Sequence, residues 1–378
     1  MTKIELVPGL AGIPAAESAV SFIDGQKGIL AYRGIRIEEL AEHSTFEETV
    51  YLLWYGELPT ADQLSAFRAS LAAQQTLPGS VVDMVRGLPT TGHPMQALQA
   101  SVAGLGMAYG RLDLADDQAC MEACLRLVAQ TPVLIAAFER HRRGQEYVEP
   151  NPELSTAANF LTCLNGEQPD DVKEGILDCA LVLHAEHTMN ASTFACRVVA
   201  STENDPYTST SGAVGTLFGP LHGGANERVL RQLEAIGGAD KVEAWLEEKT
   251  ANKGKVMGFG HRVYKTKDPR AKNLQKLVSG LFDKHGTTPL YDTALALEKA
   301  VVAKLGGKGI HPNVDFFSGI VYQKLGIATD MFTPIFALAR MPGWLAHWRE
   351  QMANNRLFRP GQIYVGKHDV SYVPMDQR

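Results

Sequence analysis

Cysteine is scarce in this sequence, with five among 378 residues. The five are odd in number and no two of them form a CxxC pair, so they give no sign of a disulfide framework or a zinc site. They are instead typical of small buried residues in a reducing compartment. The cysteines are Cys120, Cys124, Cys163, Cys179 and Cys196.

A large excess of one charge and long apolar runs are also lacking. The net charge of -6 argues against general affinity for nucleic acid and against a polybasic membrane surface. No segment approaches the roughly 20 apolar residues that a membrane span requires. The N-terminus, 1–5, reaches an acidic residue without the apolar run of a secretory signal, and it is short of arginine for a transit peptide. We expect a cytoplasmic protein that binds neither nucleic acid nor membrane.

The sequence has no sustained alternation of strands and helices and no fixed-period repeat, which argues against a parallel sheet and a repeat architecture. Two short β-prone runs, 20–23 and 29–32, flank an Asp-Gly turn signal and predict a hairpin. Apolar residues then follow helical spacing. One helix is predicted to begin at a capping-box pattern of Ser44 and Glu47 and to end at Gly56. We predict an all-α fold with a small N-terminal β-hairpin.

Two histidines stand close together in the segment LHAEHTMNAST. His184 continues an apolar stripe at helical spacing, and His187 extends it by one turn, so both are expected on a buried face. A histidine on such a face is most often a hydrogen-bonded core residue. The pair is also half of a metal site, but no HExxH pattern and no cysteine partner completes it.

Glycines surround a third histidine in the segment GPLHGGAN. They remove steric cover and let backbone or ligand approach His222 closely. The residues from Ala225 are expected to form the first turn of a helix, whose dipole lowers the pKa of a histidine at that end and favours the neutral ring as a hydrogen-bond donor. An ordinary loop between helices is an equally open interpretation.

A cluster of positive charge follows in the segment 253–272. In a chain of net negative charge, this cluster indicates a surface for a polyanionic small molecule, such as the phosphates of a nucleotide-bearing cofactor. A solvated basic face is the alternative, and neither a Walker loop nor a dinucleotide fingerprint is present. His261 lies in its middle. The charged residues are Lys253, Lys255, Arg262, Lys265, Lys267, Arg270 and Lys272, against the single acid Asp268.

An aspartate stands among apolar residues in the segment NVDFFSG. Asp315 is expected in the first turn of a helix, where the dipole favours a carboxylate, and most such residues only stabilise the helix. Its neighbours Val314, Phe316 and Phe317 would partly desolvate it. A carboxylate in such a setting can serve as a base.

Taken together and in this order, these segments resemble the citrate synthase family. The matching text is LHAEHTMNAST, GPLHGGAN, GFGHRVYKTKDPR and NVDFFSG, followed by Arg340 and by the pair Arg359-Pro360. Two earlier segments, YRGIRIEEL from Tyr32 and HPMQAL from His93, extend the resemblance over nearly the whole chain. The length is similar to that of the shorter bacterial and archaeal members.

The resemblance implies a two-domain helical fold in a homodimer. The large domain would comprise residues 1–223 and 327–378, whose C-terminal tail contacts the partner, and the small domain residues 224–326. The active site would lie in the cleft between them. Oxaloacetate would bring the small domain down on the large one. Because the chain begins close to Tyr32, it has no room for the additional N-terminal domain of NADH-regulated relatives, and we expect no inhibition by NADH.

The resemblance also implies a reaction of the tricarboxylic acid cycle. The enzyme would be an acyltransferase that condenses acetyl-CoA with oxaloacetate and hydrolyses citryl-CoA to citrate and CoA. Asp315 matches the base that removes a proton from the acetyl methyl group. His222 matches the donor to the carbonyl oxygen as the enol or enolate forms, and His261 the group that polarises the oxaloacetate ketone. No metal and no cofactor is implied, since acetyl-CoA is a co-substrate.

Further positions match the binding residues of the family. His187, Arg270 and Arg340 match the residues that hold the oxaloacetate carboxylates, and Arg359 matches an arginine supplied by the neighbouring subunit. Guanidinium groups suit this role because they bind carboxylates bidentately. The expected CoA-binding residues are Lys255, Lys265 and Lys308 for the phosphates and Gly258, Phe259 and Gly260 beside the adenine.

Three alternatives remain open on the sequence alone. The nearest is 2-methylcitrate synthase, which uses propionyl-CoA with the same trio, because one additional methylene is worth only about 1–3 kcal/mol in an apolar pocket. The second is a metal-dependent hydrolase that uses His184, His187, His222 and Asp315. The third is a non-catalytic helical scaffold whose basic segment docks a phosphorylated partner.

Overall fold

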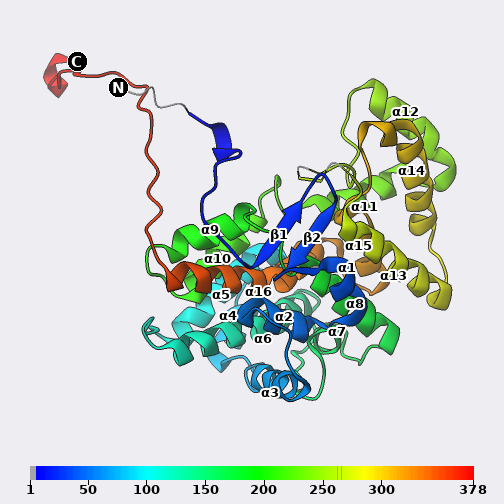
Figure 1. Ribbon diagram of the computed structural model, residues 1–378, viewed down its shortest axis with the longest axis horizontal. Coiled ribbons are helices and arrows are strands. Elements are labelled where there is room, and N and C mark those ends of the chain that lie inside the picture. The colour runs from blue at the N-terminus through cyan, green and yellow to red at the C-terminus, as the bar shows by residue number, and fades with distance from the viewer. Residues whose placement is uncertain (1–5, 262, 265) are drawn as a thin grey trace.

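The computed structural model describes residues 6–378 except 262 and 265. This part of the chain is largely helical and contains one small antiparallel sheet of three strands, β1 (Ser21–Asp24), β2 (Ile29–Tyr32) and β3 (Ile35–Arg36). Ser21 pairs with Tyr32 and Asp24 with Ile29, which confirms the predicted hairpin. The short third strand extends it. The prediction of an all-α fold with minor β structure is confirmed (Figure 1).

Ten helices precede residue 220 in the described part of the chain. They are α1 (Ile37–His43), α2 (Phe46–Tyr55), α3 (Ala61–Ala72), α4 (Gly79–Arg86), α5 (Pro94–Tyr109), α6 (Asp117–Arg142), α7 (Thr156–Asn165), α8 (Asp171–His184), α9 (Ala191–Ala200) and α10 (Pro206–Leu217).

Six further helices follow. They are α11 (Ala225–Ile236), α12 (Val242–Ala251), α13 (Pro269–His285), α14 (Pro289–Leu305), α15 (Val314–Lys324) and α16 (Phe332–Ala353). Short 3₁₀ turns are η1 (Pro8–Leu10), η2 (Ala239–Lys241), η3 (Gly306–Lys308), η4 (Thr329–Met331) and η5 (Met375–Gln377).

The start of α2 differs from the sequence prediction by one residue. Thr45, not Ser44, is the N-cap, and its side chain accepts a hydrogen bond from the Glu48 N–H. The Glu47 carboxylate accepts a hydrogen bond from the N–H of Thr156 at 2.8 Å instead of closing a capping box. A tertiary contact therefore replaces the local one, while Gly56 ends the helix in the left-handed conformation as predicted.

The long helix α6 corrects the expectation that no segment is apolar enough to span a membrane. By length and composition it would qualify, and it is the one such helix in the described part of the chain. Of its most apolar window, 78% is buried inside the protein, where it packs on α3, α4, α5, α7, α10 and α16. The apolar residues of α6 thus form the core of a folded domain.

Helix α16 holds the helical body together. It packs on α2, α5, α6, α8, α9 and α10, and residues along its whole length are buried, among them Phe332, Trp344 and Trp348. Two ionisable side chains of this helix, Arg340 and His347, are equally buried. Ionisable groups buried at this depth require compensating partners, and such groups often lie at functional sites.

Helices α11–α15 pack mainly on one another and form a second group beside the body, with α12 and α14 farthest from it (Figure 1). The group touches the body where α13 meets α8 and α1, and where α11 meets α16. The terminal segments leave the body on the same side, and residues 354–378 run outward as an extended arm (Figure 1).

Candidate functional site

A cavity of about 580 Å³ lies where the two groups of helices meet. Polar side chains from six separate segments of the described chain line it, together with residues 9, 10, 13 and 15 of the N-terminal segment. Six of the seven residues predicted for catalysis and oxaloacetate binding lie on its wall: His187, His222, His261, Arg270, Asp315 and Arg340.

His222 occupies the tight turn between α10 and α11. A Cβ at Gly223 would collide with Leu217, whose carbonyl accepts the Gly223 N–H at 2.9 Å, so only glycine fits there. Helix α11 begins at Ala225, as predicted. The turn therefore presents the imidazole near the N-terminus of a helix.

The tautomer of His222 follows from its hydrogen bonds. Its Nε2 accepts a bond from the Ser192 N–H at 3.2 Å and lies 2.8 Å from the Ser192 hydroxyl oxygen. Burial, with the charge of Arg340 as a further cause, lowers the pKa of His222 to about 4. The ring is therefore neutral at physiological pH, and its proton lies on Nδ1, where it can be donated.

The loop with His261 is pinned to the segment that starts α15. Gly260 N–H donates to the His311 carbonyl at 2.9 Å, and Asn313 N–H donates to the Gly258 carbonyl at 2.9 Å. The φ angle of Gly258 is +81°, and a Cβ there would press on Phe316. These contacts hold His261 and the first turn of α15 in one rigid unit.

His261 is oriented by backbone donors. Its Nδ1 accepts hydrogen bonds from the N–H groups of Val263 at 3.0 Å and Tyr264 at 3.2 Å. In the neutral ring the proton then lies on Nε2, which makes that atom the donor. The ring lies against His187, with 5.4 Å between ring centroids.

Asp315 lies in the first turn of α15, after the N-cap Asn313, whose side chain accepts the Asp315 N–H. Its flanking residues Val314, Phe316 and Phe317 are buried, while Asp315 itself lines the cavity. Burial raises the pKa of Asp315 to about 6, and the positive charge of Arg270 opposes the rise. The carboxylate is thus a stronger base than an exposed one.

Arg270 is buried in the first turn of α13 and is held by Asp268, the N-cap of that helix. The pair is bidentate, with Nε–Oδ1 at 3.1 Å and Nη2–Oδ2 at 2.8 Å. Burial would lower the pKa of Arg270, but the charge of Asp268 holds it above its ordinary value. The guanidinium group therefore stays charged beside the cavity.

Arg340 is a buried cation with little compensation. It is 1% exposed, its Nε donates to the His184 carbonyl at 2.8 Å, and the guanidinium carbon lies 4.9 Å from the centre of the Phe336 ring. Its Nη2 has no hydrogen-bond partner among the described residues. Burial lowers the pKa of Arg340, which means that its charge is destabilised by desolvation. An anion in the cavity would offset this destabilisation.

His187 is buried as predicted, but it lies outside the helix. Helix α8 ends at His184 because the Tyr32 hydroxyl bonds to the turn that follows, accepting the Glu186 N–H at 3.2 Å and donating to the Glu186 carbonyl at 3.0 Å. His187 Nε2 lies 3.2 Å from the Tyr264 hydroxyl oxygen. Burial, then the charge of Arg270, holds the pKa of His187 well below its usual range.

The remaining predicted residues lie elsewhere in the described chain. Arg359 is exposed on the C-terminal arm and does not line the cavity. Lys255 is exposed on a loop of the second helix group, Lys308 is exposed at the end of η3, and Phe259 forms a β-bridge with Pro312. Lys265, the third lysine predicted for CoA, lies outside the described residues.

Three features of the site were missed from sequence. Ser192, which contacts His222, also accepts the indole N–H of Trp344 at 3.1 Å. Tyr264 and Asp268 hold His187 and Arg270 from within the basic segment. All three residues are part of the sequence motifs quoted above. No sequence pattern, however, indicates which hydroxyl or carboxyl group will position another side chain.

The donors for a metal do not converge. Within residues 6–378, leaving aside 262 and 265, no group of three His, Cys, Asp or Glu side chains is arranged to hold a metal ion. His184 bonds through Nδ1 to the Ala180 carbonyl at 2.7 Å and does not line the cavity. It is a core histidine.

Comparisons with known proteins identify the family of this chain. The family model described as "Citrate synthase, C-terminal domain" matches residues 9–361. The chain belongs to the citrate synthase family. A citrate synthase from Synechocystis sp. is 53% identical over 98% of this chain and 93% of that protein. One from Acidithiobacillus ferridurans is 47% identical over the full length of both.

Solved citrate synthase structures share the fold. The crystal structure of citrate synthase from Pyrobaculum aerophilum has a TM-score of 0.92 and 41% identity, covering 99% of this chain and 95% of that one. The citrate synthase of Thermoplasma acidophilum, solved as a ternary complex with carboxymethyl coenzyme A and oxaloacetate, has a TM-score of 0.92 and 33% identity over 99% and 100% of the chains.

Proposed function

We propose that this chain condenses acetyl-CoA with oxaloacetate and hydrolyses the resulting citryl-CoA to citrate and CoA. One observation carries the proposal: a carboxylate with a raised pKa, two imidazoles with assigned donor nitrogens and two buried arginines line a single cavity. The relatives described above are named citrate synthases and none a 2-methylcitrate synthase, so acetyl-CoA is the proposed substrate.

The first chemical step is the removal of a proton from the acetyl methyl group. A methyl group next to a thioester is a very weak acid, so the base requires a donor at the developing oxyanion. Asp315 takes the proton, and the Nδ1–H of His222 donates a hydrogen bond to the thioester oxygen as the enolate forms; transfer of the Nδ1 proton to that oxygen gives the enol. The neutral ring has this proton to give, and it recovers the proton when the enol attacks.

The second step forms the carbon–carbon bond. The enol carbon attacks the ketone carbon of oxaloacetate, and the Nε2–H of His261 donates to the ketone oxygen as it becomes an alkoxide and then a hydroxyl. Arg270 and Arg340 bind the carboxylates of oxaloacetate, with His187 beside them. Water then hydrolyses the thioester and releases CoA. These groups suffice without a metal or a further cofactor.

The CoA phosphates are proposed to bind Lys255, Lys265 and Lys308, with Gly258, Phe259 and Gly260 beside the adenine. The basic segment supports this placement, because a group of lysines in a chain of net charge -6 attracts a polyanion. Phe259 packs on Phe316 with 4.6 Å between ring centroids, which joins this loop to the catalytic helix.

A domain boundary and a closing motion are part of the proposal. Residues 224–326 form the small domain, with 1–223 and 327–378 as the large one. His187, His222 and Arg340 then belong to the large domain, while His261, Arg270 and Asp315 belong to the small one. Oxaloacetate bound between Arg340 and Arg270 would draw the two together and exclude water from the enol.

We further propose a homodimer in the cytoplasm. The arm 354–378 carries exposed apolar side chains, among them Val365 at 92% and Tyr372 at 80%, which is unfavourable for an isolated chain. Arg359 lies on this arm, and it would complete the site of the partner subunit. The five cysteines are free and buried, which suits a reducing compartment.

A thiol-release assay tests the reaction. With oxaloacetate present, the protein should release CoA from acetyl-CoA with a kcat/KM at least tenfold above that for propionyl-CoA, in line with the about 1–3 kcal/mol of one methylene. Omitting oxaloacetate should abolish release, which excludes simple thioester hydrolysis. Equal or better turnover of propionyl-CoA would assign the chain to 2-methylcitrate synthesis instead.

Mixed dimers test the role of Arg359. Asp315→Asn and Arg359→Leu proteins should each be nearly inactive, yet unfolding and refolding an equal mixture should recover about a quarter of wild-type activity. Half of the dimers are then mixed, and each has one site with Asp315 and the partner's Arg359 intact. If Arg359 served its own subunit, every site would lack one group and no activity would return.

A further inference from the structure

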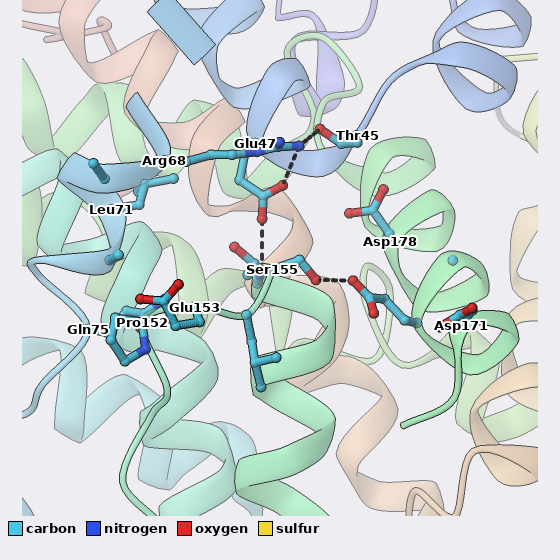
Figure 2. A pocket seen from close by; sticks show the side chains of 16 residues that line it. Thr45, Glu47, Arg68, Leu71, Gln75, Pro152, Glu153, Ser155, Asp171 and Asp178 are labelled. Atoms are coloured by element: carbon cyan, nitrogen blue, oxygen red, sulfur yellow. Dashed lines mark hydrogen bonds and ion pairs between the residues drawn. The ribbon is translucent and has the colours of Figure 1, made fainter. Parts of the chain in front are cut away.

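A second cavity, of about 570 Å³, lies in the helical body and shares no lining residue with the first. Helix α3 forms one wall, the first residues of α2 and the loop 152–155 lie between, and α8 forms the other wall. Figure 2 shows Glu47 in the middle, Gln75 and Glu153 on one side, and Asp178 and Asp171 on the other. The proposed reaction uses none of these residues.

Negative charge dominates this cavity. Five carboxyl groups line it, on Glu47, Glu153, Asp171, Glu174 and Asp178, against one cation, Arg68. Three of the five recur along one face of α8 at positions i, i+3 and i+7. Like charges at such spacing destabilise a helix, so the apo protein bears a cost that a bound cation would remove.

Two buried oxygen atoms on the wall have no hydrogen-bond donor within the part of the chain that the structure describes. Glu47 is 3% exposed, and its Oε2 accepts no hydrogen bond from a described residue. The Arg68 guanidinium is 3.9 Å from that oxygen and about half exposed, which is a weak compensation. Gln75 is 7% exposed, and its Oε1 likewise has no donor among the described residues. Buried acceptors of this kind call for a donor.

The shape of the site indicates which donor fits. In the described part of the chain the carboxylates are too dispersed for three of them to hold one metal ion. Three of them stand on α8, Glu47 lies in the middle, and Glu153 lies on the opposite side with Gln75 (Figure 2). On that opposite side α3 contributes the apolar side chains of Ala69, Leu71 and Ala72. A linear ligand with cationic ends and an aliphatic middle matches both features.

We propose that this acidic cavity binds a linear aliphatic polyamine, whose ammonium groups pair with the carboxylates of α2 and α8 and donate to the buried oxygens of Glu47 and Gln75. The methylene chain packs on the apolar face of α3. Ammonium groups are donors only, and every polar lining group named above except Arg68 can accept from them.

Protonation of Asp178 tunes the affinity. Its carboxylate faces Glu47 of α2, Arg68 of α3 and Glu174 of its own helix, and it accepts the Phe46 N–H at 3.1 Å. Burial, then the charge of Glu47, raises the pKa of Asp178 to about 7. At pH 6 the group is mostly neutral and at pH 8 mostly charged, so a polyamine binds more tightly at pH 8.

Calorimetric titration of the full-length protein with spermidine at pH 8 tests the proposal. One site per chain is expected, with at least about tenfold weaker binding in Asp171→Asn/Glu174→Gln, since each lost charge pair costs of order 1 kcal/mol. Arg68→Gln should instead tighten binding by a fewfold, a gain that a misfolded protein cannot produce. Asp178→Asn should bind equally at pH 6 and pH 8.

The matched control is Glu247→Gln/Glu248→Gln, which removes two exposed carboxylates from α12 and should leave the affinity within twofold of wild type. An equal loss of spermidine affinity in this control would mean that the polyamine is attracted by surface charge in general, and it would overturn the proposal. Tighter binding of Mg²⁺ than of spermidine would also overturn it, as would the absence of saturable binding. Thiol release from acetyl-CoA is measured on the same α8 variants. This separates the test of polyamine binding from the test of the proposed reaction.

Discussion

Replacing Asp315 with asparagine is expected to lower kcat by roughly 10³-fold, because general base catalysis contributes about 10²–10⁴ to such reactions. Asparagine keeps the size of the side chain and its polarity, so the cavity retains its shape. The amide cannot accept the methyl proton, however, and the enol does not form. Steady-state thiol release with saturating oxaloacetate and acetyl-CoA measures the loss.

The same carboxyl group sets the acid side of the pH profile. Burial raises the pKa of Asp315 to about 6, so the fraction of active base falls tenfold for each pH unit below that value and reaches a plateau above it. His222 has a pKa lowered to about 4 and stays neutral across this range. The residual activity of Asp315→Asn should lack the descending limb.

Stability distinguishes loss of chemistry from loss of fold. Since the folded-state pKa of Asp315 lies above the ordinary value of 3.8, its ionisation costs the folded state stability as the pH rises between the two values. Asp315→Asn should therefore unfold at the same or a higher temperature than wild type at pH 8. A lower unfolding temperature with proportional loss of activity would assign Asp315 a structural role.

Asp292→Asn is the matched control. Asp292 also lies in the first turn of a helix, α14, and does not line the catalytic cavity. Both substitutions remove a charge that favours the helix dipole, worth about 0.3–1 kcal/mol. Only Asp315→Asn should lose turnover, which separates catalysis from helix capping.

Arg340→Lys is expected to raise the KM for oxaloacetate by about 100-fold, since losing a partner of a buried charge pair costs of order 2–5 kcal/mol. The guanidinium group of Arg340 bonds to the His184 carbonyl through Nε and has Nη2 available for the substrate. Lysine keeps the charge but lacks this planar, forked group. The ammonium group cannot satisfy both. Initial rates over a range of oxaloacetate concentrations give the KM.

Small-angle scattering supplies a second measurement on this variant. Oxaloacetate should reduce the radius of gyration of the wild type, because Arg340 and Arg270 lie on opposite sides of the proposed cleft, and Arg340→Lys should require far more ligand for the same change. Arg33→Lys is the control, since Arg33 also donates to a main-chain carbonyl, that of Leu53, outside the cavity. Unchanged KM in Arg340→Lys would refute its assigned role.

Local rules predicted much of the secondary structure and failed where tertiary contacts compete. The hairpin and the glycine end of α2 follow from turn and cap chemistry. The N-cap of α2 did not follow from local rules, because the Glu47 carboxylate accepts a hydrogen bond from the N-terminus of α7. Helix α8 stops at His184 because of a tyrosine 152 positions earlier in the chain, Tyr32, which no local pattern reveals.

The sequence by itself determined the family, the helical class and the candidate residues His187, His222, His261, Arg270, Asp315 and Arg340, because side-chain chemistry and motif order are written in it. Only the tertiary structure decided how they work. Convergence on one cavity, the donor nitrogen of His222, the raised pKa of Asp315 and the lack of a partner for Arg340 Nη2 among the described residues all depend on burial or on partners distant in the chain. The donor nitrogen of His261 depends on the local fold of its loop. Desolvation and hydrogen bonding arise from packing, and packing joins segments that sequence spacing cannot relate.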